Sequence, residues 1–133
     1  MTRPAPKPVR FLPTRAEFRI LEVLWKAGRG TVDDIVTGLD SKPPANYKTV
    51  QTLLRIMEKK MFVRHQTRGR AFVFVPCVKR AEVMRRSIRD LLQHNFGGSP
   101  TELMINLLEG EHIDESELTE LEAVIRRFRA QRE

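Results

Sequence analysis

The sequence predicts a mainly α-helical fold that carries one small antiparallel β-hairpin and is divided into two domains. Apolar residues recur with helical spacing in three segments before residue 60 and in three more after residue 80. Two β-rich runs, joined by a turn that contains glycine, lie between these two groups of helices. The net charge also changes sign along the chain, from +11 over residues 1–80 to −4 over residues 81–133. A basic first part joined to an acidic second part suggests a polyanion-binding domain attached to a domain with another task.

The composition limits the class of protein. The 133 residues suffice for one domain or two small ones, and a hydrophobic content of 41% is typical of globular proteins. No apolar run approaches the roughly 18 residues that a membrane span needs, and the first residues lack the apolar core of a signal peptide. We therefore expect a cytoplasmic protein without a membrane partner. The single cysteine, Cys77, excludes an internal disulfide framework.

The first two helices are marked by the residues that cap them. Residues 1–12 contain three prolines and three cations without any periodicity, which predicts a disordered basic tail. Thr14 and Glu17 have the spacing of a capping box and predict the start of a helix that ends at Gly28. A second, shorter helix is expected to begin after Thr31.

A third helix is predicted to begin at Asn46, after a segment that contains two prolines and cannot continue a helix. Its apolar residues have the spacing of one buried face and are Val50, Leu53, Leu54 and Met57. The other face carries amide, hydroxyl and cationic groups, which suit base edges and phosphates. We therefore expect a DNA-recognition helix whose polar first turn and free face bind DNA through Asn46, Lys48, Thr49, Gln51, Thr52 and Arg55.

The hairpin that follows is predicted from Phe62–Gln66 and Ala71–Val75, two β-rich runs. Gly69 supplies the positive φ that a tight connection between them usually requires. Three arginines are expected to bind phosphate or a minor groove, and these are Arg64, Arg68 and Arg70. Three helices and this two-stranded wing predict a winged helix-turn-helix DNA-binding domain over residues 13–78.

Residues 79–133 predict a second domain of three helices. Gly97 and Gly98 end its first helix, Ser99 and Glu102 have the spacing of a capping box for the second, and the third opens at Asp114. Three short helices have too little bulk to bury so many apolar side chains alone, so we expect a homodimer. The residues expected at the dimer contact are Ile88, Leu91, Leu92, Leu103, Met104, Leu107, Leu108, Leu118, Leu121, Ile125 and Phe128.

Other classes of protein find less support in the sequence. The chain has no glycine-rich phosphate loop, no HExxH motif and no Ser/His/Asp set in context, so we expect neither an enzyme nor a bound cofactor. Residues able to bind metal match no familiar site in their spacing, and these are His65, His94, His112 and Cys77. Two alternatives stay open: a winged helix that binds only other proteins, and a DNA-binding protein without sequence preference.

The aromatic residues allow one further alternative, which is that they are stacking platforms for single-stranded nucleic acid. Three of them lie in apolar periodic runs, and these are Phe18, Trp25 and Phe72. We therefore expect these three to pack in the core.

Several stretches, taken together, resemble the penicillinase-repressor family, which includes the β-lactamase and methicillin-resistance repressors and related copper-responsive repressors. The stretches that carry the resemblance are Leu12-Pro13-Thr14, Glu17, Ile20-Leu21, Leu24-Trp25, Tyr47 to Leu54, Gly69 to Phe72, Phe96 to Ser99 and Asn106-Leu107. The resemblance implies a dimeric transcriptional repressor that binds palindromic operators upstream of the genes it controls. By position, Lys48, Thr49, Gln51 and Thr52 would face the major groove, and Tyr47 would lie near the DNA backbone.

The resemblance also bears on how repression would end. In the β-lactamase-type members, a sensor-linked protease cuts a bond between Asn and an aromatic residue in the dimerisation domain. The matching bond here is Asn106–Leu107, with leucine in place of the aromatic residue. The copper-responsive members carry a C-terminal pair of Cys-x-Cys motifs, which this chain lacks, so we do not expect copper sensing by that route.

Overall fold

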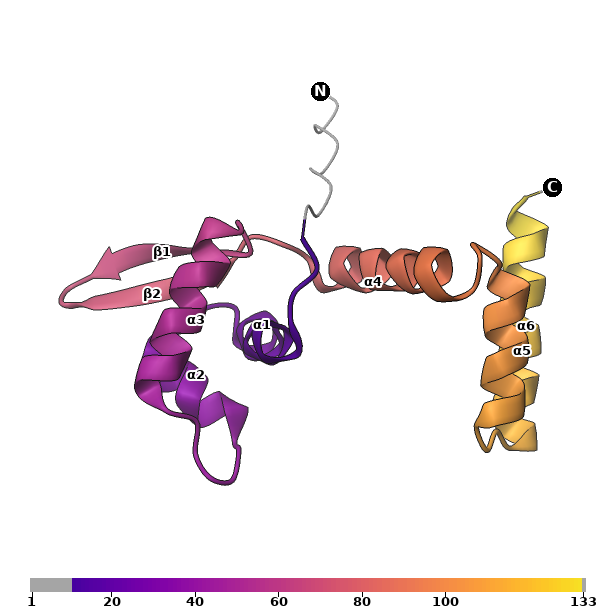
Figure 1. Ribbon diagram of the computed structural model, residues 1–133, viewed down its shortest axis with the longest axis horizontal. Helices are drawn as coiled ribbons and strands as arrows, with labels where there is room; N and C mark the ends of the chain where they lie inside the picture. The colour runs from indigo at the N-terminus through magenta and orange to yellow at the C-terminus, as the bar shows by residue number, and fades with distance from the viewer. Residues whose placement is uncertain (1–10, 133) are drawn as a thin grey trace. The chain divides into compact units, whose positions relative to one another are not determined.

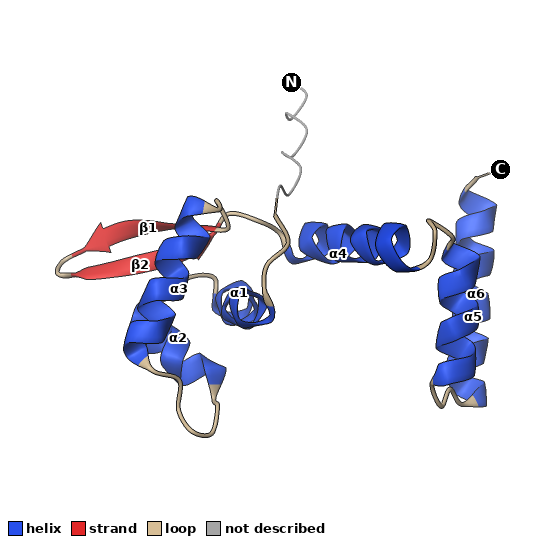
Figure 2. Cartoon of the chain, in the orientation of Figure 1, coloured by secondary structure: helices blue, strands red, loops and turns tan. Residues whose placement is uncertain are grey.

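The computed structural model describes residues 11–132, and these form six helices and one sheet of two antiparallel strands (Figure 1). The elements in chain order are α1 (Arg15–Ala27), α2 (Val32–Leu39), α3 (Tyr47–Lys59), β1 (Val63–Arg68), β2 (Ala71–Pro76), α4 (Arg80–Asn95), α5 (Pro100–Gly110) and α6 (Glu115–Gln131). The strands follow α3 and precede α4 in the chain, and Figure 2 shows one small pair of strands among helices, so the predicted mainly α fold with a small wing is confirmed. The predicted basic tail lies outside the described residues, except for Phe11 and Leu12.

The predicted starts of the first two helices are confirmed by their capping side chains. Thr14 Oγ1 accepts a hydrogen bond from the Glu17 N–H at 3.2 Å, and the Glu17 carboxylate accepts one from the Thr14 N–H at 2.8 Å. Thr31 and Asp34 exchange the same two bonds at the start of α2. Both pairs supply partners to N–H groups that a helix leaves unpaired in its first turn.

One hydrophobic core lies among α1, α2, α3 and the hairpin. Its buried members are Ile20, Leu21, Leu24, Val32, Ile35, Val50, Leu54, Met57, Phe62, Val63 and Phe74. Helix α3 contributes Val50, Leu54 and Met57, which confirms the buried face predicted from their spacing. Since these three residues hold one side of α3 in the core, its other side is free to meet a partner.

Helix α2 packs closely on α1 at Gly38. A Cβ atom at this position would lie 2.6 Å from Cγ1 of Val23, which is nearer than real Cβ atoms approach one another. Any larger residue would therefore force either the Val23 side chain or α2 itself to shift. Trp25 on α1 packs against the same core, as expected, and its indole Nε1–H donates to the Val78 carbonyl at 2.8 Å.

The chain divides into two compact units, of which the first ends at Ile88 and the second begins at Arg89. This division falls inside α4, whose Val83 is completely buried in the first unit. The sequence placed the domain limit between residues 78 and 79, before this helix. In the structure the first unit extends ten residues further, from 78 to 88.

The second unit has little core of its own. Among residues 89–132 the structure describes none that is buried. Ser99 caps α5 by accepting a hydrogen bond from the Glu102 N–H at 3.1 Å. The full capping box predicted there was wrong, because the Ser99 N–H donates instead to the Phe96 carbonyl at 2.9 Å.

Helix α6 begins at an aspartate that is stabilised in its charged form. The Asp114 carboxylate accepts hydrogen bonds from the Ser116 hydroxyl at 2.7 Å and from the Glu117 N–H at 2.9 Å. The bond from Ser116, with a smaller contribution from Glu117, lowers the pKa of Asp114 below its ordinary value. The cap therefore contributes stability above the ordinary carboxyl pKa and loses it as the pH falls through the lowered value.

Candidate nucleic-acid interface

The free face of α3 carries every residue that the sequence assigned to DNA contact on this helix. All of them are exposed, and they are Asn46, Tyr47, Lys48, Thr49, Gln51, Thr52 and Arg55. Since the opposite face holds the core residues of α3, the helix must present this set outward.

Two members of this set are partly occupied by the helix itself. Asn46 Oδ1 accepts hydrogen bonds from the N–H groups of Lys48 and Thr49, at 2.8 and 3.3 Å. The Thr52 hydroxyl donates to the Lys48 carbonyl at 2.9 Å. Within residues 11–132, no hydrogen bond or ion pair occupies the side chains of Lys48, Gln51 or Arg55. These three side chains are therefore available to another molecule.

The wing is a hairpin with a two-residue turn. Arg68 pairs with Ala71, which leaves Gly69 and Arg70 at the turn. Gly69 has a φ of 61°, and a positive φ at the first turn position suits the type II′ turns that connect hairpin strands. Arg68 and Arg70 therefore lie at the exposed tip of the wing, as predicted.

The register of the hairpin separates the three wing arginines. Residues directly opposite each other share a face, so His65 and Thr67 lie on the same face as Phe74 and Phe72. Because side chains alternate along a strand, Arg64 and Arg68 lie on the opposite face. All three arginines are exposed, but they do not form a single cluster on one side of the sheet.

A hollow of about 390 Å³ lies between α3, the start of α2 and the wing. It is lined by Thr31, Val32, Asp33, Tyr47, Gln51, Arg55, Glu58, His65, Arg70, Ala71, Phe72 and Phe74. Four residues that the sequence assigned to DNA contact line it together, namely Tyr47, Gln51, Arg55 and Arg70. Helix α3 and the wing thus form one continuous concave surface.

The sequence did not predict the contacts that hold the wing against the helices. On the outer edge of β2, Phe74 exchanges two backbone hydrogen bonds with Gly30, at 2.8 and 3.0 Å. On the outer edge of β1, the His65 N–H donates to Glu58 Oε1 at 3.1 Å, and the His65 ring contacts the same carboxylate. His65 and Phe74 are opposite each other, so both anchors act at one level of the hairpin. We call these contacts the wing anchor.

Phe72 shows where the core ends along the wing. The expectation that it packs in the core was wrong, because its side chain is 52% exposed. It lies on the same face as the buried Phe74, two residues further toward the tip. Its ring stacks on the His65 ring instead, with 4.4 Å between centroids. The face predicted for Phe72 from the alternation of the strand was correct, but the core ends at Phe74 and does not reach Phe72.

Removing the carboxylate of the wing anchor is expected to loosen the hairpin. In Glu58→Ala the His65 N–H loses its acceptor, and a hydrogen bond to a charged group contributes about 1.5 kcal/mol. We therefore expect the His65 amide to exchange with deuterium about ten times faster. Glu58→Gln keeps a carbonyl acceptor and should lie between the two.

Asp33→Asn is the matched control, because it removes another negative charge from the same hollow without touching the wing. Exchange at His65 that is equal in Glu58→Ala and in the unaltered protein would show that the carboxylate does not hold the wing.

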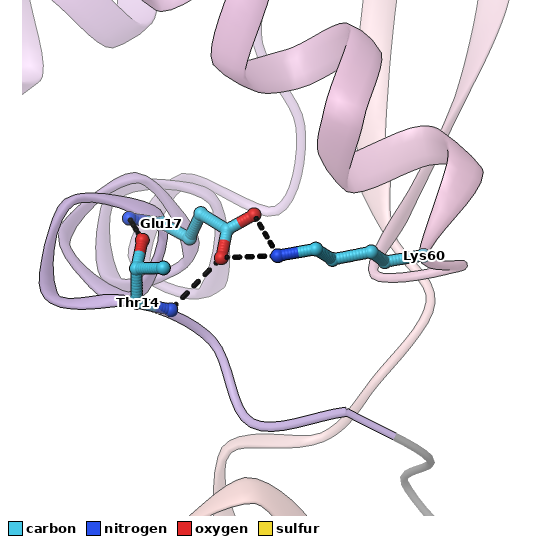
Figure 3. A network of polar contacts seen from close by, with 3 residues as sticks. All are labelled: Thr14, Glu17 and Lys60. Atoms are coloured by element: carbon cyan, nitrogen blue, oxygen red, sulfur yellow. Dashed lines mark hydrogen bonds and ion pairs between the residues drawn. The ribbon is translucent and has the colours of Figure 1, made fainter.

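A second contact that the sequence did not predict joins the start of α1 to the end of α3. Glu17 is 1% exposed, and its carboxylate oxygens lie 3.0 and 3.1 Å from the Nζ of Lys60, which is 29% exposed (Figure 3). The same carboxylate accepts the Thr14 N–H, as Figure 3 also shows. The capping box was visible in the sequence, but nothing there indicated a partner 43 residues away.

Cys77 follows the wing and is a free cysteine. Desolvation by burial raises the pKa of its thiol, and nearby Arg64 offsets part of this effect. The raised pKa lowers the fraction of thiolate, which makes Cys77 a weaker nucleophile.

Residues 11–132 offer neither a cluster of metal ligands nor a helix that could span a membrane. No group of three or more His, Cys, Asp or Glu side chains is arranged to hold a metal ion in this part of the chain. None of its helices combines the length and apolar character needed to cross a membrane.

Comparison with known proteins gives the family. A sequence model of the penicillinase repressor family matches residues 13–127, which is most of the chain. The chain belongs to this family. The resemblance noted in the sequence is therefore confirmed, and the match includes both the winged helix and the helices that follow it.

Individual relatives in the family are distant but cover most of the chain. The penicillinase repressor of Bacillus licheniformis is 24% identical over 110 residues, which are 83% of this chain and 86% of that protein. The methicillin resistance regulatory protein MecI of Staphylococcus aureus is 19% identical over 110 residues, 83% of this chain and 89% of that protein. Among solved structures, the DNA binding domain of the repressor BlaI covers 59% of this chain and 93% of its own, with 26% identity and a TM-score of 0.47.

Proposed function

We propose that this protein is a transcriptional repressor that binds operator DNA as a homodimer, through α3 and the wing of each subunit. Membership of the penicillinase repressor family supports the regulatory role. The observation that carries the DNA-binding part is the free face of α3, where Lys48, Gln51 and Arg55 have no partner within residues 11–132. Two of them, Gln51 and Arg55, also adjoin the wing. Since the partner is operator DNA, we place the action of the protein in the cytoplasm.

Charge supports a polyanionic partner. Residues 1–80 carry 17 Lys and Arg against 6 Asp and Glu. In this proposal α3 enters the major groove, where Gln51 reads a base edge and the neighbouring cations bind phosphates. The arginines of the wing bind the backbone or the adjacent minor groove. Phosphate contacts of this kind supply affinity, and base contacts supply sequence preference.

The apolar surface of the last three helices supports a second copy as partner. Six of the residues expected at the dimer contact are exposed, and they are Ile88, Leu91, Leu107, Leu108, Ile125 and Phe128. The other five are half-buried, and they are Leu92, Leu103, Met104, Leu118 and Leu121. Ile105 and Val124, which the sequence prediction left out, are also exposed. A two-fold dimer would read a palindromic operator whose half-sites are about 10 base pairs or slightly more apart.

Relief of repression by proteolysis is the finer part of the proposal. The Asn106–Leu107 bond lies inside α5, and Asn106 Nδ2 donates to the Glu102 carbonyl one turn earlier at 2.8 Å. A sensor-linked protease would therefore need a locally unfolded α5. Cleavage there would weaken dimerisation. Each DNA-binding domain would then no longer hold the other at a high effective concentration near the second half-site. Repression that is lifted while the chain stays intact would contradict this route.

The experiment for the proposed function is binding of the purified protein to the DNA upstream of its own gene. Fluorescence anisotropy at two salt concentrations, with random DNA as competitor, separates the alternatives. Tight binding that resists competitor supports an operator-specific repressor, and footprinting then gives the half-site spacing. Equal, salt-sensitive binding to all sequences indicates a protein without sequence preference. No binding at low salt would indicate a winged helix that binds only proteins.

Arg68 at the wing tip provides a test of the phosphate contacts. In Arg68→Ala we expect operator and random DNA to lose affinity by the same factor, because a phosphate carries no sequence information. The slope of log affinity against log salt should fall by about one. Arg29→Ala, which removes an exposed arginine outside α3 and the wing, should leave the slope nearly unchanged. A loss confined to operator DNA would instead make Arg68 a base reader.

A further inference from the structure

Helix α6 carries an apolar stripe that the rest of residues 11–132 covers only in part. Leu121, Val124, Ile125 and Phe128 have the spacing i, i+3, i+4 and i+7, which places them on one face of a helix. Leu121 is half-buried, and the other three are 40%, 52% and 57% exposed, increasing along the helix. The stripe is symmetric about the point between Val124 and Ile125.

Charges of opposite sign flank this stripe on its two sides. Glu120 and Arg127 are seven residues apart, which is two helical turns, so they lie on one flank. Glu122 and Arg129 have the same separation and lie on the other flank. All four side chains are exposed. Each flank therefore has its glutamate in the first half of α6 and its arginine in the second half.

This pattern distinguishes the two ways in which α6 can meet a second α6. In an antiparallel pair each flank faces the same flank of the other helix, which runs in the opposite direction. Glu120 therefore meets Arg127 of the other copy, and Glu122 meets Arg129 of the other copy. In a parallel pair each flank faces the opposite flank at the same height. Glu120 would then meet Glu122, and Arg127 would meet Arg129. Opposite charges meet in the first arrangement, and like charges meet in the second.

Contacts within one subunit leave these charges available. Glu122 lies 3.9 Å from Arg126, but both side chains are at least 70% exposed, and such surface pairs contribute little. The Arg127 guanidinium lies 5.8 Å from the centre of the Phe128 ring, at the edge of the apolar stripe.

We propose that α6 docks antiparallel on the α6 of a second copy of this chain, and that the four flanking charges set the orientation and select the partner. The proposal rests on the homodimer of the proposed function and specifies which surface forms it. The apolar stripe supplies most of the attraction, because exposed ion pairs contribute mainly to specificity. A related chain with another charge order on α6 would be a poor partner.

Two charge-reversal variants test whether the flanks matter. Glu120→Arg with Glu122→Arg makes both flanks positive, and Arg127→Glu with Arg129→Glu makes both negative. We expect each variant alone to dimerise at least ten times more weakly than the unaltered protein in sedimentation equilibrium at low salt. A mixture of the two should recover the affinity as a heterodimer. The control is Arg126→Glu with Ala130→Glu, on the face of α6 turned away from the stripe, which should change little.

A fourfold exchange tests the orientation. The chain with Glu120→Arg, Glu122→Arg, Arg127→Glu and Arg129→Glu restores opposite charges in an antiparallel homodimer. It should dimerise nearly as well as the unaltered protein, yet form few mixed dimers with it in native mass spectrometry. A parallel pair predicts the reverse, weak homodimers and abundant mixed ones, and that result would overturn the proposal. Circular dichroism of each variant checks that the helices persist.

The results also separate this inference from the proposed function. An unaltered protein that dimerises while every reversal variant dimerises equally well would overturn the α6 contact and leave the homodimer standing. An unaltered protein that stays monomeric at all concentrations would contradict both.

Discussion

Replacing Lys60 by methionine is expected to lower the free energy of unfolding by about 3 kcal/mol, because it leaves a buried carboxylate without its cation. Glu17 is 1% exposed and loses both contacts to the Lys60 Nζ, while methionine keeps nearly the same length and apolar stem. The expected value stands at the low end of the range for buried pairs, because Lys60 is itself 29% exposed. Urea unfolding followed by circular dichroism measures the change.

Lys59→Met is the matched control. Lys59 is the neighbouring lysine at the end of α3, it is exposed, and no ion pair holds it within the described part of the chain. We expect its substitution to change stability by less than about 0.5 kcal/mol. Equal effects of the two substitutions would show that the contact between Lys60 and Glu17 contributes nothing of its own.

The single variant Glu17→Leu and the double variant Glu17→Leu with Lys60→Met complete a double-mutant cycle with Lys60→Met. Removing both charges abolishes the unpaired carboxylate, so the double variant should be more stable than Lys60→Met alone. The Glu17 substitution also removes the acceptor of the Thr14 N–H. Losing such a capping hydrogen bond at a helix start costs about 1 kcal/mol. The recovery should therefore be incomplete. A fully additive cycle would mean that the two side chains do not interact.

This ion pair marks the limit of what the sequence could predict about the fold. Helix starts were predictable because their determinants are local, as with Thr14 and Glu17 or Thr31 and Asp34, which lie three residues apart. The contact of Glu17 with Lys60 joins residues 43 positions apart. Which lysine meets the carboxylate depends on how α1 packs on α3, and periodicity says nothing about that packing.

The wing shows a similar division between local and distant information. The turn at Gly69 and the alternation of β2 were visible in the sequence. Alternation gives the face on which a side chain lies but not the point at which the core ends, so Phe72 was assigned to the core although it is exposed. The anchoring of His65 by Glu58 also needed the position of the hairpin relative to α3.

The sequence predicted the candidate DNA-binding residues in part. Helical periodicity was enough to place Lys48, Gln51 and Arg55 on the free face of α3, because a helix with one buried face must expose the other. It did not predict the hollow in which Gln51 and Arg55 adjoin Arg70 of the wing. That arrangement follows from the strand register and the wing anchor, both of which are tertiary.

Replacing Gln51 by alanine is expected to weaken operator binding by about ten- to a hundredfold, since a bidentate contact to a base contributes roughly 1–3 kcal/mol of discrimination. Gln51 is exposed on the free face of α3, and none of the residues 11–132 occupies its amide. An amide can both donate to and accept from an adenine edge, so its loss removes sequence preference rather than general attraction. Affinity for random DNA should stay within about a factor of two, because no charge is lost.

Gln66→Ala provides the control, because it removes the same amide from an exposed position on β1 and should leave the specificity ratio unchanged. The ratio of operator to random affinity at one salt concentration is the quantity to compare, since both affinities depend on salt. Binding of the Gln51→Ala variant to operators with single base-pair changes should then identify the base that Gln51 reads. It is the position at which the variant no longer distinguishes base pairs. Equal losses on operator and random DNA would instead assign Gln51 to the backbone contacts, and sequence reading would fall to Lys48, Thr49, Thr52 and Arg55 on the same face of α3.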